Sequence, residues 1–502
     1  LTDLRSSLLI CRSSPAGDSY GSQLTGWAVT QYGPAATTAR HSPVRPPEPA
    51  RLKAPMRMMR SWRTVVWTGL LLIALTSVPA AAQAQTGVRM VPPPNDGERY
   101  WPRWRGPSGQ GVVDGSGYVD TWSETTNVRW RTPVPGSGHS SPIVWGDQIF
   151  LTTSRDGGRR LSLLSFRRSD GALLWETDAP EGRVERHHGK NTPASATPTT
   201  DGELIYVTFL EVGEKSIIAT NVSRPRPVKP GQMVVAAYDF QGNQKWMVRP
   251  GGFVSVHGYC TCPVLFGNKL ILNGDHDGDA FLVALDKRTG ETIWKTPREY
   301  KTRSYVTPLI RKIGGRTEMV LSGNRCVAAF DPDTGKRLWI VQGPTEQFVA
   351  SMVYDGARYY LSAGFPTHHV MAIRPGGSGD VTDSHVEWHV TNAKCYVPSP
   401  VVTAKHLFVA DDRGTVNCFE AKSGKQIWKE RLGRQYSASL VTAGGLVYLV
   451  DDQGTTKVVR PDAKLDVVET NPLGEPCRAS PAISNGRIYL RGTKHLYCIG
   501  NE

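Results

Sequence analysis

The sequence predicts an all-β protein, a single eight-bladed β-propeller closed by an N-terminal strand. Three observations carry this prediction: a glycine-to-tryptophan phrase that occurs six times, a phrase of small residues and proline that precedes it, and a last repeat that lacks its final strand. Repetition at roughly 40–50 residues, with strand-like segments between the copies, is typical of propellers.

The first phrase places a glycine four residues before a tryptophan, usually with Asp, Thr or Ser just before the glycine. Glycine supplies the positive φ that a short hairpin loop needs, and Asp can hydrogen-bond its own turn. One large aromatic per repeat, always in register, predicts packing between neighbouring blades rather than contact with a cofactor. The clear copies end at Trp175, Trp246, Trp294, Trp339 and Trp428, and a looser copy, SHVEWHV, contains Trp388.

The second phrase marks the start of each blade. Proline suits the innermost strand, which is an edge facing the central channel, and small side chains suit a crowded axis. The phrase occurs at Pro142, Pro198, Pro263, Pro308, Pro400 and Pro481, and without proline at Ala350-Ser351-Met352 and Ala438-Ser439-Leu440. These are eight starts; seven blades stay the alternative, because residues 437–470 lack the tryptophan.

The closure of the ring is also predicted. The last repeat, RASPAISNGRIYLRGTKHLYCIGNE, stops before any returning strand with tryptophan, and an upstream segment, NVRWRTPV, offers Trp130 in the expected place. An N-terminal strand that completes the last blade would remove the exposed sheet edges.

The first 84 residues are interpreted as dispensable to the fold. Residues 1–55 are rich in Ser, Pro, Ala and Arg and indicate disorder or an over-extended reading frame, and 56–84 resemble a signal peptide with an apolar run from Val65 and an A-x-A site ending at Ala84. Residues 85–125 are then a lead-in and 126–502 the propeller. No cysteine follows the apolar run, so we expect a soluble periplasmic or extracellular protein without a lipid anchor.

Charge and cysteines narrow the classes of function. The net charge of the whole chain is +14, and residues 1–84 hold six more basic than acidic residues, so the remaining residues carry a net charge of +8. This moderate positive charge predicts contact with anionic surfaces or polymers but not with nucleic acid. Eight cysteines include Cys11 in the leader, and the spacing of the other seven identifies no disulfide. Cys418 and Cys498 share the repeat position of Ala284 and Ala329, which predicts small core residues. Nucleophile-elbow, Walker and HExxH motifs are absent.

Loops that enter the inner strands predict a binding face. Basic and aromatic residues gather there, and a concave polar and aromatic rim is a usual binding site; solvation of the rim is the equally weighted alternative. The candidate ligand-binding residues are His139, His187, His188, His257, Tyr259, Arg303, Tyr305, Arg434 and Arg478, with Lys190, Asn191, Lys394, Tyr396, Tyr436 and Glu475 beside them.

Two further hypotheses concern this face. Asp275, Asp277 and Asp279 in NGDHDGDAF resemble a calcium loop, although turn formation explains them as well. An unstructured partner chain would depend on loop apolar residues, and an anionic ligand on loop arginines. The first set is Phe253, Phe348 and Phe365, and the second is Arg303, Arg434 and Arg478.

The phrases ALDKRTGETIW and AFDPDTGKRLW resemble the repeat of the pyrroloquinoline quinone (PQQ) dehydrogenase-like superfamily. Within it, WPRWRGPSGQGV and GHSSPIVWGDQIFLTT are similar to exported bacterial PQQ-binding-like propellers and to the propeller lipoprotein of the outer-membrane β-barrel assembly machinery. This resemblance implies a binding or scaffold protein of the cell envelope. Its partner would be an envelope protein, a polymer or an anionic small ligand.

The same resemblance also implies an alternative, a quinoprotein alcohol dehydrogenase. Those enzymes stack PQQ between a tryptophan and a ring of adjacent disulfide-bonded cysteines, next to calcium and an aspartate base. Here the nearest approach to adjacent cysteines is Cys260-Thr261-Cys262. The sequence motifs therefore support neither PQQ nor calcium as a cofactor, and the interpretation leans away from an enzyme.

Overall fold

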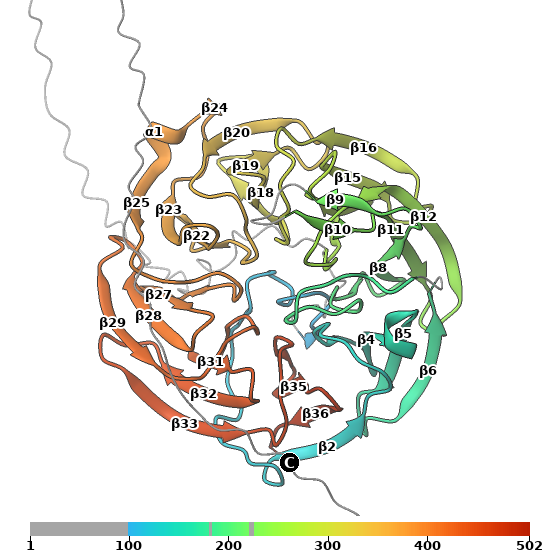
Figure 1. Cartoon of the computed structure of the whole chain (residues 1–502). Helices are drawn as coiled ribbons and strands as arrows, with labels where there is room; N and C mark the ends of the chain where they lie inside the picture. Colours follow the sequence, from blue (N-terminus) through green and yellow to red (C-terminus); the bar gives the residue numbers. More distant parts are fainter. Residues whose placement is uncertain (1–98, 180–182, 220–224, 502) are drawn as a thin grey trace, which may run out of the picture. The chain divides into compact units, whose positions relative to one another are not determined.

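The computed structural model describes residues 99–179, 183–219 and 225–501, all within one compact unit, Pro79–Glu502. Eight antiparallel sheets follow one another around a central axis (Figure 1). The predicted eight-bladed propeller is confirmed, and the seven-bladed alternative is wrong because residues 441–472 form a complete four-stranded blade without the tryptophan. The predicted extension at 1–55 and signal peptide at 56–84 lie outside the described residues.

Each blade runs from an inner to an outer strand. The first blade consists of β3 (Ile143–Trp145), β4 (Gln148–Arg155), β5 (Arg160–Arg167) and β6 (Leu173–Asp178), and the second of β7 (Thr199–Thr200), β8 (Ile205–Val212), β11 (Gly231–Tyr238) and β12 (Gln244–Phe253). The third blade consists of β13 (Val264–Phe266), β14 (Lys269–Gly274), β15 (Phe281–Asp286) and β16 (Thr292–Pro297). The fourth consists of β17 (Leu309–Ile313), β18 (Arg316–Gly323), β19 (Cys326–Phe330) and β20 (Arg337–Gln342), and β24 (Gly379–Asp380) pairs with β20 in parallel.

The last four blades follow the same order. The fifth blade consists of β21 (Val353–Tyr354), β22 (Tyr359–Ala363), β23 (His369–Ile373) and β25 (Val386–Val390), and the sixth of β26 (Val401–Val402), β27 (His406–Ala410), β28 (Thr415–Glu420) and β29 (Gln426–Arg431). The seventh blade consists of β30 (Val441–Ala443), β31 (Leu446–Val450), β32 (Thr455–Arg460) and β33 (Asp466–Pro472). The eighth consists of β34 (Ala482–Ser484), β35 (Arg487–Arg491), β36 (His495–Ile499) and β2 (Val128–Pro133). A short helix α1 (Thr382–His385) precedes β25, and β9 (Ile217–Ala219) pairs with β10 (Arg226–Val228) in the insertion of the second blade. Every inner strand begins directly after the predicted phrase of small residues.

The repeated tryptophans join neighbouring blades, as their register predicts. Each stands opposite a small residue, for example Trp294 opposite Ala284 and Trp428 opposite Cys418, just before a β-bulge. The indole N–H groups of Trp130, Trp175, Trp246, Trp294, Trp388 and Trp428 donate to a carbonyl of the next blade at 3.0–3.3 Å.

The glycine of the phrase has a second purpose besides its turn. Gly335 has a φ of +72°, and a Cβ there would lie 2.6 Å from Cε3 of Trp294 in the preceding blade. Glycine therefore permits the positive φ and also lets the turn approach the indole ring of the neighbouring blade. This explains why glycine and tryptophan repeat together.

The predicted closure is confirmed. β2 pairs with β36, and Trp130 faces Cys498, as Trp428 faces Cys418 in its own blade. The positions predicted for small core cysteines are thus correct. All seven cysteines within the described residues are free thiols.

The lead-in before β2 enters the central channel, which the sequence did not predict. Trp101 pairs with Val144 of β3, β1 (Val112–Val113) adds in parallel to the inner edge of β30, and the Arg311 guanidinium of β17 donates to the Ser108 carbonyl at 2.8 Å. Residues 101–113, here called the channel plug, therefore contact inner strands of several blades.

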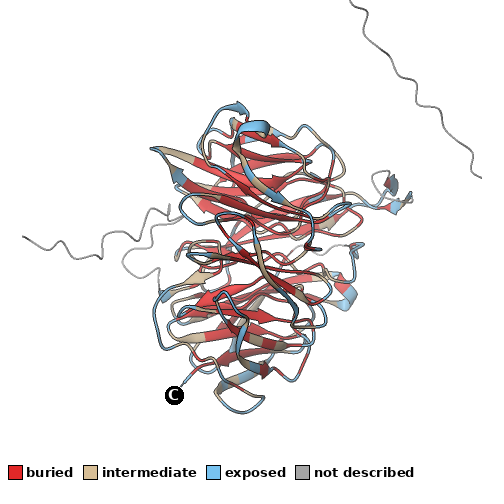
Figure 2. Cartoon of the chain, turned by 90° about the vertical axis from the view of Figure 1, so that its left-hand side faces the viewer, coloured by how far each residue is buried: buried red, intermediate tan, exposed pale blue. Residues whose placement is uncertain are grey.

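Burial follows the blade layers. The strands are mostly buried, and the exposed residues lie mainly in the loops and along the outer strands (Figure 2). Within residues 99–179, 183–219 and 225–501, none of the helices is long and apolar enough to span a bilayer.

Candidate ligand cavity on the propeller axis

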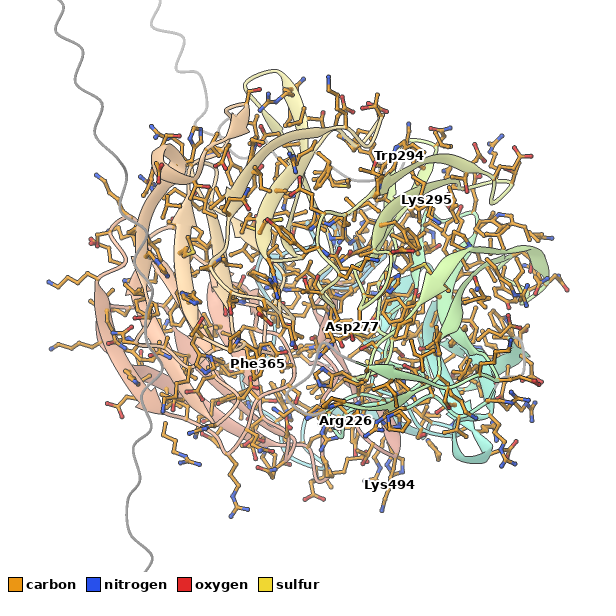
Figure 3. The ribbon with its side chains drawn as sticks, turned by 45° about the horizontal axis from the view of Figure 1, so that its top comes forward. Arg226, Asp277, Trp294, Lys295, Phe365 and Lys494 are labelled. Atoms are coloured by element: carbon orange, nitrogen blue, oxygen red, sulfur yellow. The ribbon has the colours of Figure 1, made fainter. Side chains whose placement is uncertain are left out.

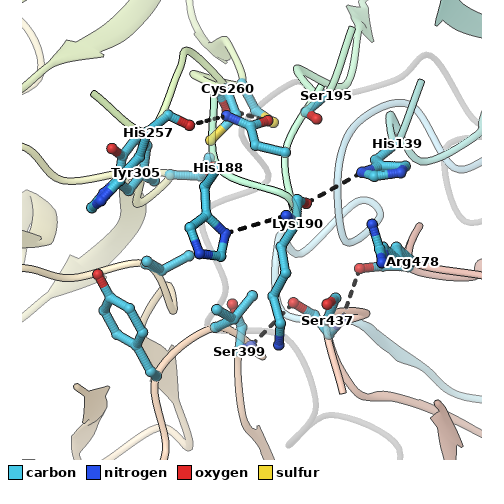
Figure 4. Close-up of a pocket in the computed structure, with 18 of the residues that line it drawn as sticks. His139, His188, Lys190, Ser195, His257, Cys260, Tyr305, Ser399, Ser437 and Arg478 are labelled. Carbon is cyan, nitrogen blue, oxygen red and sulfur yellow. Dashed lines mark hydrogen bonds between the residues drawn. The ribbon is translucent and has the colours of Figure 1, made fainter. Parts of the chain in front are cut away.

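A cavity of about 520 Å³ lies on the axis, above the channel plug. Its floor includes Trp104 of the plug, and most of its wall comes from the loops that precede the inner strands, the loops that the sequence analysis singled out. The loop residues that the figure labels surround this space (Figure 4). The cavity is lined by Trp104, His139, Ser141, His188, Lys190, Asn191, Ser195, Thr197, Arg226, His257, Cys260, Cys262, Arg303, Tyr305, Thr307, Gln347, Val349, Phe365, Tyr396, Val397, Ser399, Asp412, Ser437, Ser439, Arg478 and Ser480.

Small polar residues immediately before the inner strands form a ring around this cavity, here called the axial ring. Its members are Ser141, Thr197, Cys262, Thr307, Ser351, Ser399, Ser439 and Ser480, one from each blade. Seven N–H groups of the ring donate to the side chain of the next member at 2.8–3.3 Å, which links the blades directly: Ser141 to Thr197, Thr197 to Cys262, Thr307 to Ser351, Ser351 to Ser399, Ser399 to Ser439, Ser439 to Ser480 and Ser480 to Ser141.

The mouth of the cavity carries cations and aromatic rings. Lys190 lies 3.9 Å from the carboxylate of Asp412, and Arg478 donates to the Gly189 carbonyl at 2.8 Å. The imidazole rings of His188 and His257 meet edge to face with centroids 5.7 Å apart. Arg226 and Phe365 lie toward the middle of the same face, whereas Trp294 and Lys295 lie toward the outer edge (Figure 3).

The structure brings six of the nine candidate binding residues to the cavity: His139, His188, His257, Arg303, Tyr305 and Arg478. The other three lie elsewhere. His187 is exposed, Tyr259 is buried against Phe253 with ring centroids 4.9 Å apart, and Arg434 is exposed without lining the cavity. Tyr259 is 1% exposed and belongs to the apolar core of the second and third blades.

The three aspartates of the predicted calcium loop face three different cations. Asp275 is fully buried and bonds Arg298 at 2.9 Å, Asp277 pairs with Arg303, and Asp279 pairs with Lys301 at 2.7 Å. The described part of the chain holds no cluster of three or more His, Cys, Asp or Glu residues arranged for a metal ion. The aspartates hold the 275–279 loop to two arginines and a lysine of the following loop.

Burial sets the charge of the cavity's histidines. Desolvation, together with the nearby Arg478 and Arg491 guanidinium groups, lowers the pKa of His139 to about 4. Desolvation and Arg303 lower the pKa of His257 likewise to about 4. Both imidazoles are therefore neutral at pH 7, each with one N–H donor and one nitrogen acceptor.

Glu185 anchors the loop that carries His188 and Lys190. Its buried carboxylate accepts the Tyr259 N–H, and burial raises the pKa of this carboxyl to about 8 from 4.5. The folded protein therefore binds a proton at Glu185 that the unfolded chain releases above about pH 4.5, so the stability that this group contributes falls as the pH rises from about 4.5 to about 8 and levels off above that range.

Substitution of Glu185 by glutamine is expected to flatten the pH dependence of stability between about pH 5 and pH 8. The wild-type urea midpoint should fall over this window, because the unfolded chain ionises at Glu185 while the folded chain still holds the proton, whereas glutamine does not titrate. Equilibrium urea unfolding at about pH 5, 6.5 and 8 checks this. The exposed Glu214→Gln serves as the matched control, and an equal slope in the wild type and in Glu185→Gln would contradict the assignment.

Several cavity residues escaped the sequence analysis. Trp104 belongs to the channel plug, whose sequence is not part of the repeat, so the repeat does not predict its position. Arg226 comes from the insertion of the second blade. Asp412 comes from the loop between β27 and β28, and such loops between second and third strands share the cavity face. The axial ring was visible as the small-residue phrase, but it was interpreted only as packing.

Comparisons with known proteins agree with this fold. The family model for the outer membrane protein assembly factor BamB matches residues 107–223, 231–386 and 380–466. BamB of Bordetella pertussis is 25% identical over 303 residues, which cover 56% of this chain and 68% of that protein. A polyvinylalcohol dehydrogenase of a Pseudomonas species is 24% identical over 251 residues, or 43% of this chain and 36% of that enzyme.

Among solved structures, a quinohemoprotein alcohol dehydrogenase of Pseudomonas putida HK5 superposes with a TM-score of 0.52 at 10% identity, covering 80% of each chain. At this identity the likeness concerns the fold alone. The family model, in contrast, spans well over half of the sequence. The chain therefore belongs to the family of the outer membrane protein assembly factor BamB.

Proposed function

We propose that this chain is an exported binding protein of the bacterial cell envelope, which holds a ligand or a partner at the mouth of its axial cavity. The cavity itself carries the proposal: cationic and aromatic side chains surround one end of the channel, and the plug fills the channel beneath it. A concave site with convergent polar groups on a rigid scaffold is the usual form of a binding site.

The family supports the location and the kind of partner. The relatives named BamB are assembly factors of the outer membrane, so an envelope protein, an envelope polymer or an anionic small ligand is the partner we propose. The export predicted from the sequence supports the same proposal.

Of the apolar residues expected to contact a partner chain, only Phe365 is available. Its side chain is 46% exposed at the cavity mouth, whereas Phe253 and Phe348 are 1% and 0% exposed in the core, so their predicted role as partner contacts is wrong. Both buried rings pack inward, because a loop next to a blade must cover the blade's apolar end.

A quinoprotein-type oxidoreductase is the alternative, and the cavity does not fit its cofactor set. Calcium takes about six to eight oxygen ligands, but Asp412 alone carries a carboxylate among the described residues that line the cavity, and it faces Lys190. Cys260 and Cys262 are free thiols separated by Thr261. We therefore derive no oxidation step.

The proposal predicts that a photo-crosslinking amino acid at position 365 captures an envelope component in living cells. The matched control is position 293, where Ile293 is similarly exposed, at 41%, on the outer strand β16. Products at 365 but not at 293 support the proposal, and equal or absent products at both sites contradict it. In a second arm, PQQ with calcium and an alcohol should give no dye reduction; turnover would establish the oxidoreductase instead.

A further inference from the structure

The axial ring presents hydroxyl hydrogens that no protein group accepts. The oxygens of Ser141, Ser399, Ser439 and Ser480 each accept one backbone N–H from the neighbouring blade, and within the described ranges none of them donates in turn. All four residues are at most 5% exposed, and all four line the cavity. A hydroxyl has one donor besides its acceptor sites, and a buried donor needs a partner.

A buried positive charge lies next to the same ring. Arg105 is fully buried in the plug, directly after Trp104, and its Nη2 donates to the carbonyls of Pro400 and Leu440 at 2.6 and 3.2 Å. Each carbonyl belongs to the residue immediately after a ring member, Ser399 or Ser439. The Arg105 guanidinium thus lies directly below the ring, at the level of the residues that follow Ser399 and Ser439 in the sequence.

Two arginines at this level, Arg105 and Arg311, have no carboxylate partner among the described residues. Arg105 bonds only backbone carbonyls, its Nε and Nη1 atoms have no hydrogen-bond partner, and Arg311 likewise donates only to the carbonyls of Ile310 and Ser108. Neither arginine forms an ion pair with any residue that the structure describes. A buried charge without a counter-ion is costly, and its field extends through a medium of low dielectric constant.

We propose that the base of the cavity binds the oxyanion head group of a ligand, a carboxylate or a phosphate, which enters head first and accepts hydrogen bonds from those serine hydroxyls of the axial ring that line the cavity above Trp104. This inference rests on the proposed binding function and names the chemistry of the ligand. The rest of the ligand then extends to the mouth, where His188, His257 and Phe365 surround it.

The groups at the base favour an oxyanion over other ligands. Hydroxyl donors converge there from four blades, and the nearest charges below are guanidinium groups, which would repel a cation. A neutral sugar could use the hydroxyl groups but would leave the arginine field uncompensated. The carboxylate of Asp412 comes from the loop between β27 and β28, where Lys190 faces it.

Calorimetric titration of the full-length protein tests the inference, with sodium phosphate and sodium acetate as probes and glucose as the neutral probe, all at one ionic strength set with sodium chloride. The decisive pair of variants is Ser439→Cys and Ser351→Cys. Both residues accept a ring N–H, but only Ser439 lines the cavity. A thiol keeps the acceptor, as Cys262 does in the native ring, and donates weakly.

We expect phosphate or acetate to bind, Ser439→Cys to weaken that binding about tenfold, and Ser351→Cys to leave it unchanged, since one hydrogen bond to a charged group is lost in the first case alone. Binding of neither anion, equal binding of glucose, or equal effects of both variants would overturn the inference. Crosslinking at position 365 would be unaffected by that failure, so the proposed function and its ligand chemistry can fail separately.

Discussion

Replacement of Trp339 by alanine is expected to destabilise the propeller by about 3–5 kcal/mol, the range for a fully buried aromatic in a packed core. Trp339 is 0% exposed and belongs to the apolar cluster that joins the fourth and fifth blades. Its ring lies 6.3 Å from that of Tyr359 on the inner part of the next blade. Urea unfolding followed by circular dichroism measures the loss without depending on tryptophan fluorescence.

The matched control is Trp428→Ala in the sixth blade. Trp428 occupies the same register but is half-buried, and its indole N–H donates to the Asp462 carbonyl at 3.3 Å. Less apolar area is lost there, so we expect a cost of roughly 1–2 kcal/mol. Equal losses in the two variants would show that the tryptophans stabilise the ring by position alone and not by burial.

Replacement of Trp101 by alanine is expected to loosen the channel plug and to cost about 3 kcal/mol or more. The Trp101 side chain is fully buried, its backbone exchanges two hydrogen bonds with Val144 at 2.9 and 2.8 Å, and its ring packs under Gly106. Amide hydrogen exchange should become faster at Thr442, whose N–H donates to the Gly111 carbonyl of the plug at 2.7 Å.

Two controls accompany this variant. Exchange at Ile271, in the middle of the third blade, should stay slow because this residue is fully buried and pairs with Val264 and Ala284 within its own blade. Tyr100→Ala removes the neighbouring, half-buried aromatic and should cost less. Unchanged exchange at Thr442 in Trp101→Ala would mean that β1 is held to β30 independently of Trp101.

The blades could be predicted because their determinants are local and repeated. A glycine, a tryptophan four residues later and a small residue on the facing strand recur in fixed register, so one copy explains the others. Closure by Trp130 followed from the same register. The blade without tryptophan has the same register, because Glu469 occupies the tryptophan position opposite Val458.

The plug and part of the site could not be predicted, because single long-range contacts determine them. Nothing in the sequence around Arg105 indicates that its guanidinium reaches the Leu440 carbonyl, 335 positions away. The side chains of irregular loops have no period, so Tyr259 and Phe253 could not be separated from His257 and Phe365 by sequence alone. The cavity face was predictable from topology, whereas the direction of each side chain was not.

The contacts of residues 101–133 also determine the order in which this chain can fold. The segment that is synthesised before every blade docks against β30 and β36, which are synthesised last. Contacts of such sequence separation form late and slowly. Until the C-terminal strands arrive, the first blades have no completed ring and their edges remain open to wrong pairing. The propeller must therefore be protected from aggregation until its whole length is available, and a truncated chain is expected to be degraded rather than to persist as a smaller ring.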